Sequence, residues 1–301
     1  MLHTLQNAHW QAGILPKTGG SIAFGRMRYS GAWVDIMRPT DESDYDNASN
    51  TSSFVMLPWA NRIRDGLLRY EGQSWQLKTA SGEHARHGDV RKRAWQVVDS
   101  SETHITLRIQ SADFEDFNFP FACSAEVTYR LEDSVFVWEI ALTNEDNVVF
   151  PAGFGFHPYF VRMAEPMPML QVPCDKIFEL TDALPDDAPV PVPAEMNFQM
   201  LRAVPDDLAL DDLYANRDTS KPVRIVYPAW QTELQMHVDD LFKHVILFKA
   251  PDGSLAVEPQ TNANDGFTLH DKGLYSDGIF TIEPQKTVRG AIRWELLPYS
   301  E

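Results

Sequence analysis

Ser124-Ala125-Glu126-Val127-Thr128-Tyr129-Arg130-Leu131 and Val135-Phe136-Val137-Trp138-Glu139-Ile140-Ala141-Leu142 are neighbouring segments with a hydrophobic period of two. The turn-forming residues Glu132-Asp133-Ser134 separate them. Successive side chains of a strand point to opposite faces of a sheet, so this period indicates half-buried antiparallel strands. The two segments therefore predict a pair of strands joined by a tight turn.

The same period recurs in both halves of the chain, whereas no stretch of about 12 residues carries a clean helical stripe. There is also no Gly-rich phosphate loop and no alternation of strands with helices, which argues against nucleotide-binding α/β folds. Many short strands separated by turns predict an all-β protein, a large antiparallel β-sandwich or a barrel. The further predicted strands are 103–110, 222–227, 232–238 and 288–296, with turn signals at 99–101 and 144–147.

Length and charge limit the possible classes of protein. The chain has 301 residues and a formal net charge of −17. Large all-β folds reach this length as one unit, so we expect a single domain over residues 1–301. Prolines cluster between Pro166 and Pro205, but apolar residues recur there, which favours an irregular excursion within the domain over a linker.

Composition argues against several partners. A chain this acidic has no general attraction for nucleic acid or for anionic membranes. No apolar run approaches the roughly 18 residues of a membrane span. The start, residues 1–7, has neither the basic nor the apolar region of a secretory signal, so a cytoplasmic location is expected. The two cysteines, Cys123 and Cys174, are expected to be buried free thiols.

The segment Gly155-Phe156-His157-Pro158-Tyr159-Phe160 is the densest candidate for chemistry. His157 lies between aromatic residues and a proline that restricts its backbone. An imidazole held rigidly in an aromatic wall suits proton transfer near neutral pH. A core histidine with satisfied hydrogen bonds is the alternative, and the surroundings favour a functional role.

Two segments offer cationic binding groups. Asn61-Arg62, after an apolar stretch, presents fixed donors for hydroxyl or anionic ligands, although an exposed turn arginine fits equally well. The basic segment 84–95 includes His87 and Arg91 and is either a solvated loop or an anion-attracting rim. Gly88 argues against the helix that would let His84 and His87 share a metal ion, so no metal site is predicted.

Two further segments offer carboxylates. Glu258 ends an apolar, strand-like run in Val257-Glu258-Pro259-Gln260 and could face a cleft as a base. Glu283-Pro284-Gln285 repeats the tripeptide. Asp211, in Leu210-Asp211-Asp212-Leu213-Tyr214, suits binding of sugar hydroxyls. For each of them an exposed surface position is the plainer interpretation when the segment is taken alone.

In this order along the chain, these segments resemble the aldose 1-epimerase (galactose mutarotase) family, whose fold is a large antiparallel β-sandwich, the galactose mutarotase-like supersandwich. The resemblance runs from about residue 15 to the end. It implies interconversion of the α and β anomers of an aldose without a cofactor. The resemblance assigns His157 as the acid. It assigns the following residues to substrate binding: His87, Arg62, Asn61, Asp211, Gln260 and Arg91.

The base is the point at which the sequence departs from the galactose mutarotases, whose base is a glutamate in a late Pro-Gly-Glu segment. Here that stretch reads Glu283-Pro284-Gln285-Lys286. The hexose-6-phosphate mutarotase branch uses a glutamate in an earlier Glu-Pro segment, which corresponds to Glu258. The segment from His87 to Arg91 also resembles that branch, in which basic residues would face a phosphate. We therefore expect Glu258 as the base in preference to Glu283.

The expected substrate is a monosaccharide or a sugar phosphate, and the expected assembly is a monomer or a homodimer. Two other functions stay open at this point. A non-catalytic carbohydrate-binding protein would share the fold without the activity. A glycoside hydrolase would need two carboxylates flanking the bond, which Glu258 and Asp211 could supply.

Overall fold

Antiparallel strand pairs make up nearly all of the regular structure in this computed structural model, which describes residues 1–79, 83–163, 165–274 and 277–300. The predicted class, a large antiparallel β-sandwich, is confirmed. The alternating segments quoted above form a hairpin in which Cys123 pairs with Asn144 and Glu132 with Val135.

The largest sheet has nine strands and forms one layer of the sandwich. Its order is β10, β11, β12, β13, β29, β25, β24, β17 and β22. The bounds are β10 Gln96–Ser100, β11 His104–Gln110, β12 Cys123–Glu132, β13 Val135–Asn144, β29 Thr287–Pro298, β25 Thr232–Val238, β24 Val223–Tyr227, β17 Met169–Gln171 and β22 Arg202–Ala203.

The second large sheet carries the residues that become the candidate site. Its order is β21, β18, β23, β26, β27, β15 and β5, and β16 also pairs with β27. The bounds are β21 Val190–Pro191, β18 Cys174–Ile177, β23 Asp211–Arg217, β26 His244–Lys249, β27 Leu255–Gln260, β15 Gly155–Phe156, β16 Tyr159–Phe160 and β5 Val55–Met56.

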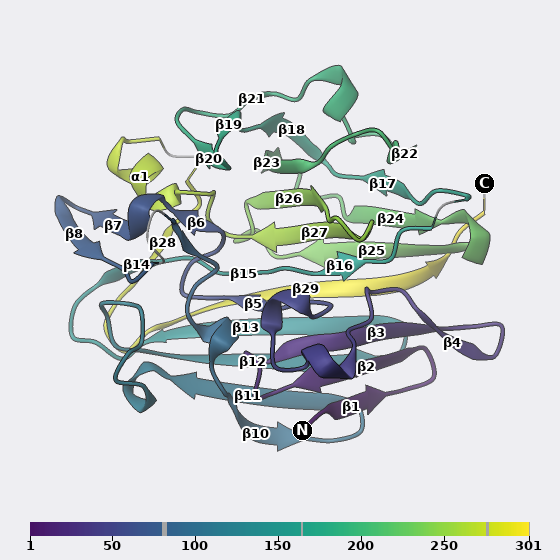
Figure 1. The fold of residues 1–301 in the computed structure, drawn as a ribbon, viewed down its shortest axis with the longest axis horizontal. Coiled ribbons are helices and arrows are strands. Elements are labelled where there is room, and N and C mark those ends of the chain that lie inside the picture. The colour runs from purple at the N-terminus through teal and green to yellow at the C-terminus, as the bar shows by residue number, and fades with distance from the viewer. Residues whose placement is uncertain (80–82, 164, 275–276, 301) are drawn as a thin grey trace.

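A four-stranded sheet, β1 to β4, completes the second layer. Figure 1 shows it over the β10–β13 end of the nine-stranded sheet, with the eight-stranded sheet over the other end. Isolated bridges between Ile22 and Ser53 and between Met37 and Phe160 connect the four-stranded sheet with the eight-stranded sheet. The bounds are β1 His3–Gln6, β2 Trp10–Leu15, β3 Ser21–Tyr29 and β4 Ala32–Asp35.

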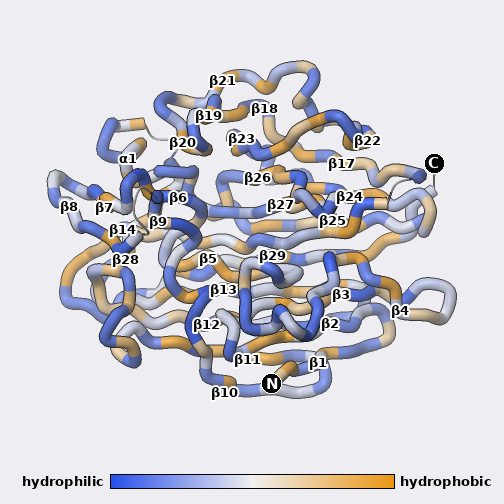
Figure 2. The backbone as a smooth tube through the Cα atoms, viewed as in Figure 1, coloured by the Kyte–Doolittle hydropathy of each residue, from blue (hydrophilic) through white to orange (hydrophobic). Residues whose placement is uncertain are grey.

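Large aromatic side chains fill the space between the layers. Trp138 of β13 lies 5.3 Å from Phe156 of β15, measured between ring centroids, and Trp294 of β29 lies 4.8 Å from Phe160 of β16. Such pairs combine a large buried apolar area with favourable ring geometry. Figure 2 shows hydrophobic and hydrophilic residues interleaved along the strands, as expected when one face of each strand meets this core.

The remaining elements are short and lie around the sheets. The two-stranded sheets pair β14 (Phe150–Ala152) with β28 (Phe280–Ile282), β19 (Leu180–Thr181) with β20 (Leu184–Pro185), β6 (Arg62–Ile63) with β9 (Ala85–Arg86), and β7 (Leu67–Tyr70) with β8 (Gln73–Gln76). The α-helix α1 covers Gly266–Asp271, and 3-10 helices cover Glu42–Asp44, Ala48–Asn50, Arg64–Gly66, Val90–Lys92, Ser111–Asp113, Ala194–Met196 and Pro228–Trp230. In the described part of the chain, no helix has the length and hydrophobicity to cross a membrane.

The predicted strands are confirmed within one or two residues, and one predicted turn is wrong in part. Segment 99–101 was assigned to a turn, but strand β10 extends through Ser100, because a bulge between Val97 and Asp99 lets polar residues stay in an edge strand. The proline-rich segment 166–205 contributes β17 and β22 to one large sheet and β18 and β21 to the other. Cys123 and Cys174 are buried free thiols, as predicted.

Candidate active site

A cavity of about 190 Å³ beside β27 brings the predicted site residues together. At about 30 Å³ per water molecule, its volume corresponds to about six waters, the scale of one sugar ring. Phe54, Tyr159, Ile246 and Phe248 form apolar walls. Seven of the eight predicted side chains line it, namely Asn61, Arg62, His87, Arg91, His157, Asp211 and Glu258.

Glu258 lies in β27, between β26 on one side and β15 and β16 on the other, and it is 1% exposed. Its Oε1 lies 3.1 Å from Nε2 of His157. Its Oε2 is buried without a hydrogen-bond partner among the described residues. Burial, and then the negative charge of Asp211, raise the pKa of Glu258 well above its ordinary value, while Arg62 lowers it.

His157 lies between β15 and β16, and its ring is clamped by aromatic groups. The ring centroid lies 4.5 Å from that of Phe54 and 4.7 Å from that of Tyr159. The backbone N–H of His157 donates to the Phe54 carbonyl at 3.0 Å. Burial lowers the pKa of His157 to about 3, and the charges of Arg38, Arg91 and Arg62 act in the same direction.

The two pKa shifts place one mobile proton between Glu258 and His157. A raised carboxyl pKa and a lowered imidazole pKa both favour the uncharged partners over the ion pair. At 3.1 Å, Glu258 Oε1 and His157 Nε2 are close enough for a proton to pass directly between them. This pair can accept a proton through one atom and release one through another while its net charge stays zero.

Left-handed backbone residues bring His87 next to this pair. His87 has φ 60° and donates its N–H to the Asn61 carbonyl at 2.6 Å, and Asn61 has φ 54°. Gly88 follows with φ 67°, and a Cβ there would lie 1.9 Å from the Leu57 carbonyl oxygen. Only glycine fits so close an approach at positive φ. The His87 ring therefore stands edge-on, 5.3 Å from the ring of His157.

Three arginines surround the cavity, and they differ in burial. Arg62 is half-buried and donates to Asn61 Oδ1 at 3.0 Å, and burial lowers its pKa although Asp211 and Glu258 oppose that shift. Arg91 is buried, donates to Ser49 Oγ at 2.8 Å, and has its pKa lowered to about 10 by burial and then by Arg86.

Arg86 is exposed at the mouth of the cavity. Arg91 makes no ion pair with any carboxylate in the described ranges. The cavity therefore presents positive charge on one side, although the chain as a whole is acidic.

Gln260 is the predicted site residue that the structure does not bring to the cavity. It is fully buried two positions beyond Glu258 in β27, paired with Gly155 and His244 in the neighbouring strands, and its Nε2 reaches Asn264 Oδ1 at 3.4 Å. Glu283 is exposed and does not line the cavity. Of the two candidate bases, Glu258 lines this cavity and Glu283 does not.

Sequence reasoning missed several cavity residues. Arg86 lay within the basic segment, and Tyr159 within the histidine segment, but neither was selected. Ile246 faces Glu258 across the β26–β27 pair, and that pairing is invisible before the strand order is known. Phe54 and Ser49 come from segments without a distinctive pattern in the sequence.

A larger cavity, about 720 Å³, lies elsewhere, beside β18, β23 and β26. None of the eight predicted side chains lines it. Its histidine–carboxylate contact joins His270 Nδ1 to Asp277 Oδ2 at 3.2 Å. Volume alone therefore does not identify the candidate site, which is set by where the acid–base pair lies.

Solved structures show which class of sandwich this is. A GalM/aldose epimerase homologue from C. elegans superposes with a TM-score of 0.85 at 18% identity, over 100% of this chain and 99% of that one. Galactose 1-epimerase from Lactobacillus acidophilus NCFM gives a TM-score of 0.81 at 16% identity, over 99% of this chain and 94% of that one. The fold is thus a galactose mutarotase-like β-sandwich.

The family model for aldose 1-epimerase matches residues 2–277, and the chain belongs to this family. An aldose 1-epimerase from Haemophilus influenzae is 24% identical over 259 residues, which cover 78% of this chain and 72% of that protein. The uncharacterized protein YihR from Escherichia coli K12 is 26% identical over 220 residues, 71% of this chain and 70% of that protein.

Proposed function

We propose that this protein is an aldose 1-epimerase that interconverts the α and β anomers of an aldose or an aldose phosphate. The contact between Glu258 and His157 carries the proposal, because anomer exchange needs one group that takes a proton and one that gives a proton at the same time. Both groups are buried beside a cavity on the scale of one sugar ring.

In the proposed reaction the ionised pair acts on the closed sugar. Glu258 takes the proton of the anomeric hydroxyl, and His157 gives its Nε2 proton to the ring oxygen. The C1–O5 bond breaks with its electron pair going to O5, and a C1=O double bond forms. Rotation about C1–C2 followed by the reverse proton transfers closes the ring on the opposite face of the carbonyl group.

The surroundings of the pair suit this cycle. Proton transfer converts a carboxylate and an imidazolium into two neutral groups, which is the state that burial favours. Arg62 lowers the pKa of Glu258 and so supports the carboxylate form that starts the reaction. The reverse proton transfers restore the ionised pair, and the direct 3.1 Å contact between Glu258 Oε1 and His157 Nε2 supports that pair at the start of the next turnover.

The other cavity residues are proposed to bind the sugar. Asn61, Arg62 and His87 offer donors to ring and hydroxyl oxygens, and Asp211 at the mouth offers an acceptor. Arg91, with Arg86 beside it, is proposed to face an anionic substituent such as a phosphate, because its guanidinium lacks a carboxylate partner among the described residues.

The test is anomer exchange on three substrates. Polarimetry follows freshly dissolved α-D-glucose and α-D-galactose, and NMR exchange follows glucose 6-phosphate. We expect acceleration of at least one, lost in His157→Ala and kept in His237→Ala, which removes a partly exposed histidine of β25. Preference for the phosphate that disappears in Arg91→Gln would assign the anionic subsite.

Two outcomes contradict the proposal. A folded protein that binds these sugars but accelerates none of the exchanges is a carbohydrate-binding protein on the same fold. Release of a chromophore from an aryl glycoside, lost in Glu258→Gln, would instead make the protein a glycoside hydrolase, with Glu258 and Asp211 as the two carboxylates.

A further inference from the structure

The polar segment that follows Glu258 is buried. Thr261, Asn262 and Asp265 are 0% exposed, and Asn264 is 1% exposed. Polar side chains after a strand are usually solvated, and burying them is costly unless they are hydrogen-bonded. Here their bonds lead to other segments of the chain, including two that carry site residues.

Thr261 holds the segment that carries His157. Its backbone N–H donates to the Phe154 carbonyl at 2.8 Å, and its Oγ1 accepts from the Phe154 N–H at 2.9 Å. Phe154 lies three residues before His157, so both members of the acid–base pair rest on the same strand end. Their distance is therefore set by short, local connections.

Asn262 holds the segment that carries Arg62. Its Oδ1 accepts from the Ala60 N–H at 2.9 Å, and its Nδ2 donates to the Ala60 carbonyl at 3.0 Å. The amide thus occupies the place that a neighbouring strand would take. Gly153 leaves room for it, because a Cβ there would lie 2.0 Å from Asn262 Oδ1.

Asp265 holds the same segment on the other side of Arg62. Its backbone N–H donates to the Arg62 carbonyl at 2.7 Å. Its Oδ1 accepts from the Arg64 N–H and its Oδ2 from Arg64 Nε, each at 3.0 Å. Asp265 has φ 51°, a region in which aspartate is tolerated better than most residues. Arg62 is therefore fixed through the residues on both sides of it.

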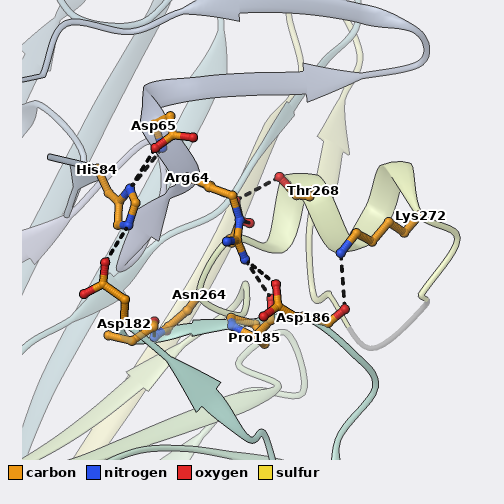
Figure 3. Close-up of polar contacts among 11 residues, drawn as sticks. Arg64, Asp65, His84, Asp182, Pro185, Asp186, Asn264, Thr268 and Lys272 are labelled. Carbon is orange, nitrogen blue, oxygen red and sulfur yellow. Dashed lines mark hydrogen bonds and ion pairs between the residues drawn. The ribbon is translucent and has the colours of Figure 1, made fainter. Parts of the chain in front are cut away.

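Arg64 extends these connections to the rim of the site. Its Nη2 pairs with Asp186 Oδ1 at 2.7 Å, next to the β19–β20 hairpin (Figure 3). Asn264 Nδ2 donates to the Ala183 carbonyl of the same hairpin at 2.9 Å. Figure 3 also shows His84 between Asp65 and Asp182, and Lys272 donating to the Asp186 carbonyl, so several contacts attach the hairpin and the residue that follows it.

We propose that Asp265 is a positioning residue that sets where the Arg62 guanidinium stands relative to Glu258. The inference rests on the proposed function of the cavity, since it gives Arg62 a sugar to bind. Asp265 itself does not line the cavity. It acts through the backbone of residues 62–64, and a shift of that backbone moves the guanidinium away from both the substrate and the carboxylate that it polarises.

The test compares Asp265→Asn with a matched change in the other layer. Asn keeps an acceptor for the Arg64 N–H but loses the charge that pairs with Arg64 Nε. We expect kcat/KM for anomer exchange to fall about tenfold, mainly through KM. The control is Glu233→Gln, which removes a buried carboxylate from its 2.6 Å pair with Arg224 in the nine-stranded sheet and should leave KM unchanged.

A double-mutant cycle separates positioning from a general structural role. If Asp265 acts through Arg62, Asp265→Asn lowers kcat/KM by less than about twofold in an Arg62→Gln background. A full, additive loss in that background would overturn the proposal. Arg64→Lys, which keeps the backbone donor to Asp265, gives a second route to the same test if Asp265→Asn does not fold.

Failure of the proposed function is visible separately. If the wild-type protein exchanges no anomers, the same double-mutant cycle is measured on sugar affinity by ligand-observed NMR. Additive losses of affinity from Asp265→Asn and Arg62→Gln would again contradict positioning. A wild-type protein that neither binds nor exchanges the three sugars overturns both proposals.

Discussion

Strands β12 and β27 show how differently the two layers use a strand. In β12, buried and half-buried side chains alternate from Ala125 to Leu131, as a strand with one covered face requires. In β27, all six residues from Leu255 to Gln260 are buried. A strand that is covered on both faces has no solvent for its polar groups, so each polar side chain in it needs a partner or a ligand.

Two buried glutamates, Glu233 in the nine-stranded sheet and Glu258 in the eight-stranded sheet, differ in how completely their carboxylates are paired. Both carboxylate oxygens of Glu233, in β25, accept from Arg224, at 2.8 and 2.6 Å, and this pairing lowers the pKa of Glu233. Glu258 has one oxygen against His157 and one without a partner in the described chain, and its pKa is raised. The first carboxylate stabilises the fold, and the second is held in a state that suits proton transfer.

Replacing each of these two carboxylates by an amide should distinguish their roles, because one change should affect kcat and the other the free energy of unfolding. Glu258→Gln should lower kcat for anomer exchange about 10³-fold, because the amide cannot take the anomeric proton. Its free energy of unfolding should not fall, since the amide removes a buried, incompletely paired carboxyl group. Glu233→Gln should instead lower the free energy of unfolding by about 1–3 kcal/mol and keep kcat. Polarimetry and urea denaturation measure the two effects.

An exposed glutamate provides the control for this pair. Glu283→Gln should leave both quantities unchanged, because Glu283 is exposed and outside the cavity. An unchanged kcat in Glu258→Gln together with a large loss in Glu283→Gln would assign the base to the later segment and contradict the acid–base pair proposed above.

A substitution in the core should lower stability and leave catalysis nearly unchanged, the opposite of what is expected for Glu258→Gln. Leu142 in β13 is fully buried in the main core. Leu142→Ala should lower the free energy of unfolding by about 2–5 kcal/mol through lost apolar contacts and the cavity left behind. At a temperature where the variant remains folded, kcat/KM should stay within about twofold of wild type. A large kinetic effect would show that the two layers are coupled more tightly than their contacts indicate.

Six strands of the nine-stranded sheet, β11, β12, β13, β24, β25 and β29, could be predicted from the sequence because each follows a local alternating pattern, whereas β10, β17 and β22 lack one. Segments 232–238 and 288–296 alternate because one face meets the core, and the structure places strands there. β27 obeys no such rule, because it is flanked by the adjacent β26 on one side and on the other by β15 and β16, which lie about a hundred residues earlier in the sequence. A carboxylate at the end of an apolar run marked Glu258 as a candidate, and the resemblance to the hexose-6-phosphate mutarotase branch selected it over Glu283.

The candidate binding residues could be predicted from the sequence only where a motif marked them. Asn61 and His87 were selected from such motifs, but their left-handed backbone conformations were seen only in the structure. Gln260 was assigned through the resemblance, in the segment Val257-Glu258-Pro259-Gln260, but its side chain does not line the cavity. Ile246 lies beside Glu258 through the β26–β27 pairing, and Asp265 accepts from the Arg64 N–H of a distant segment; no motif in the sequence marks either contact.

The smallest expected effect is a shift in the pH profile. The pair is active while it holds one shared proton, so kcat/KM should fall when a second proton is bound at low pH and when the shared proton is lost at high pH. Because burial lowers the pKa of His157 to about 3, the acidic fall should lie below the usual histidine range. The raised pKa of Glu258 places the alkaline fall above the usual carboxyl range.

Asp211→Asn tests whether the charge of Asp211 helps to set the pH of the alkaline fall in kcat/KM. Asp211 raises the pKa of Glu258, so its removal lowers that pKa and should move the alkaline fall of kcat/KM to lower pH. Arg62→Gln removes a charge that lowers the pKa of Glu258 and should move the fall in the opposite direction. Asp212→Asn, at the next position of β23, is the control and should leave the profile in place. Shifts of equal sign in Asp211→Asn and Arg62→Gln, after subtraction of uncatalysed exchange, would mean that a group other than Glu258 sets the alkaline limb.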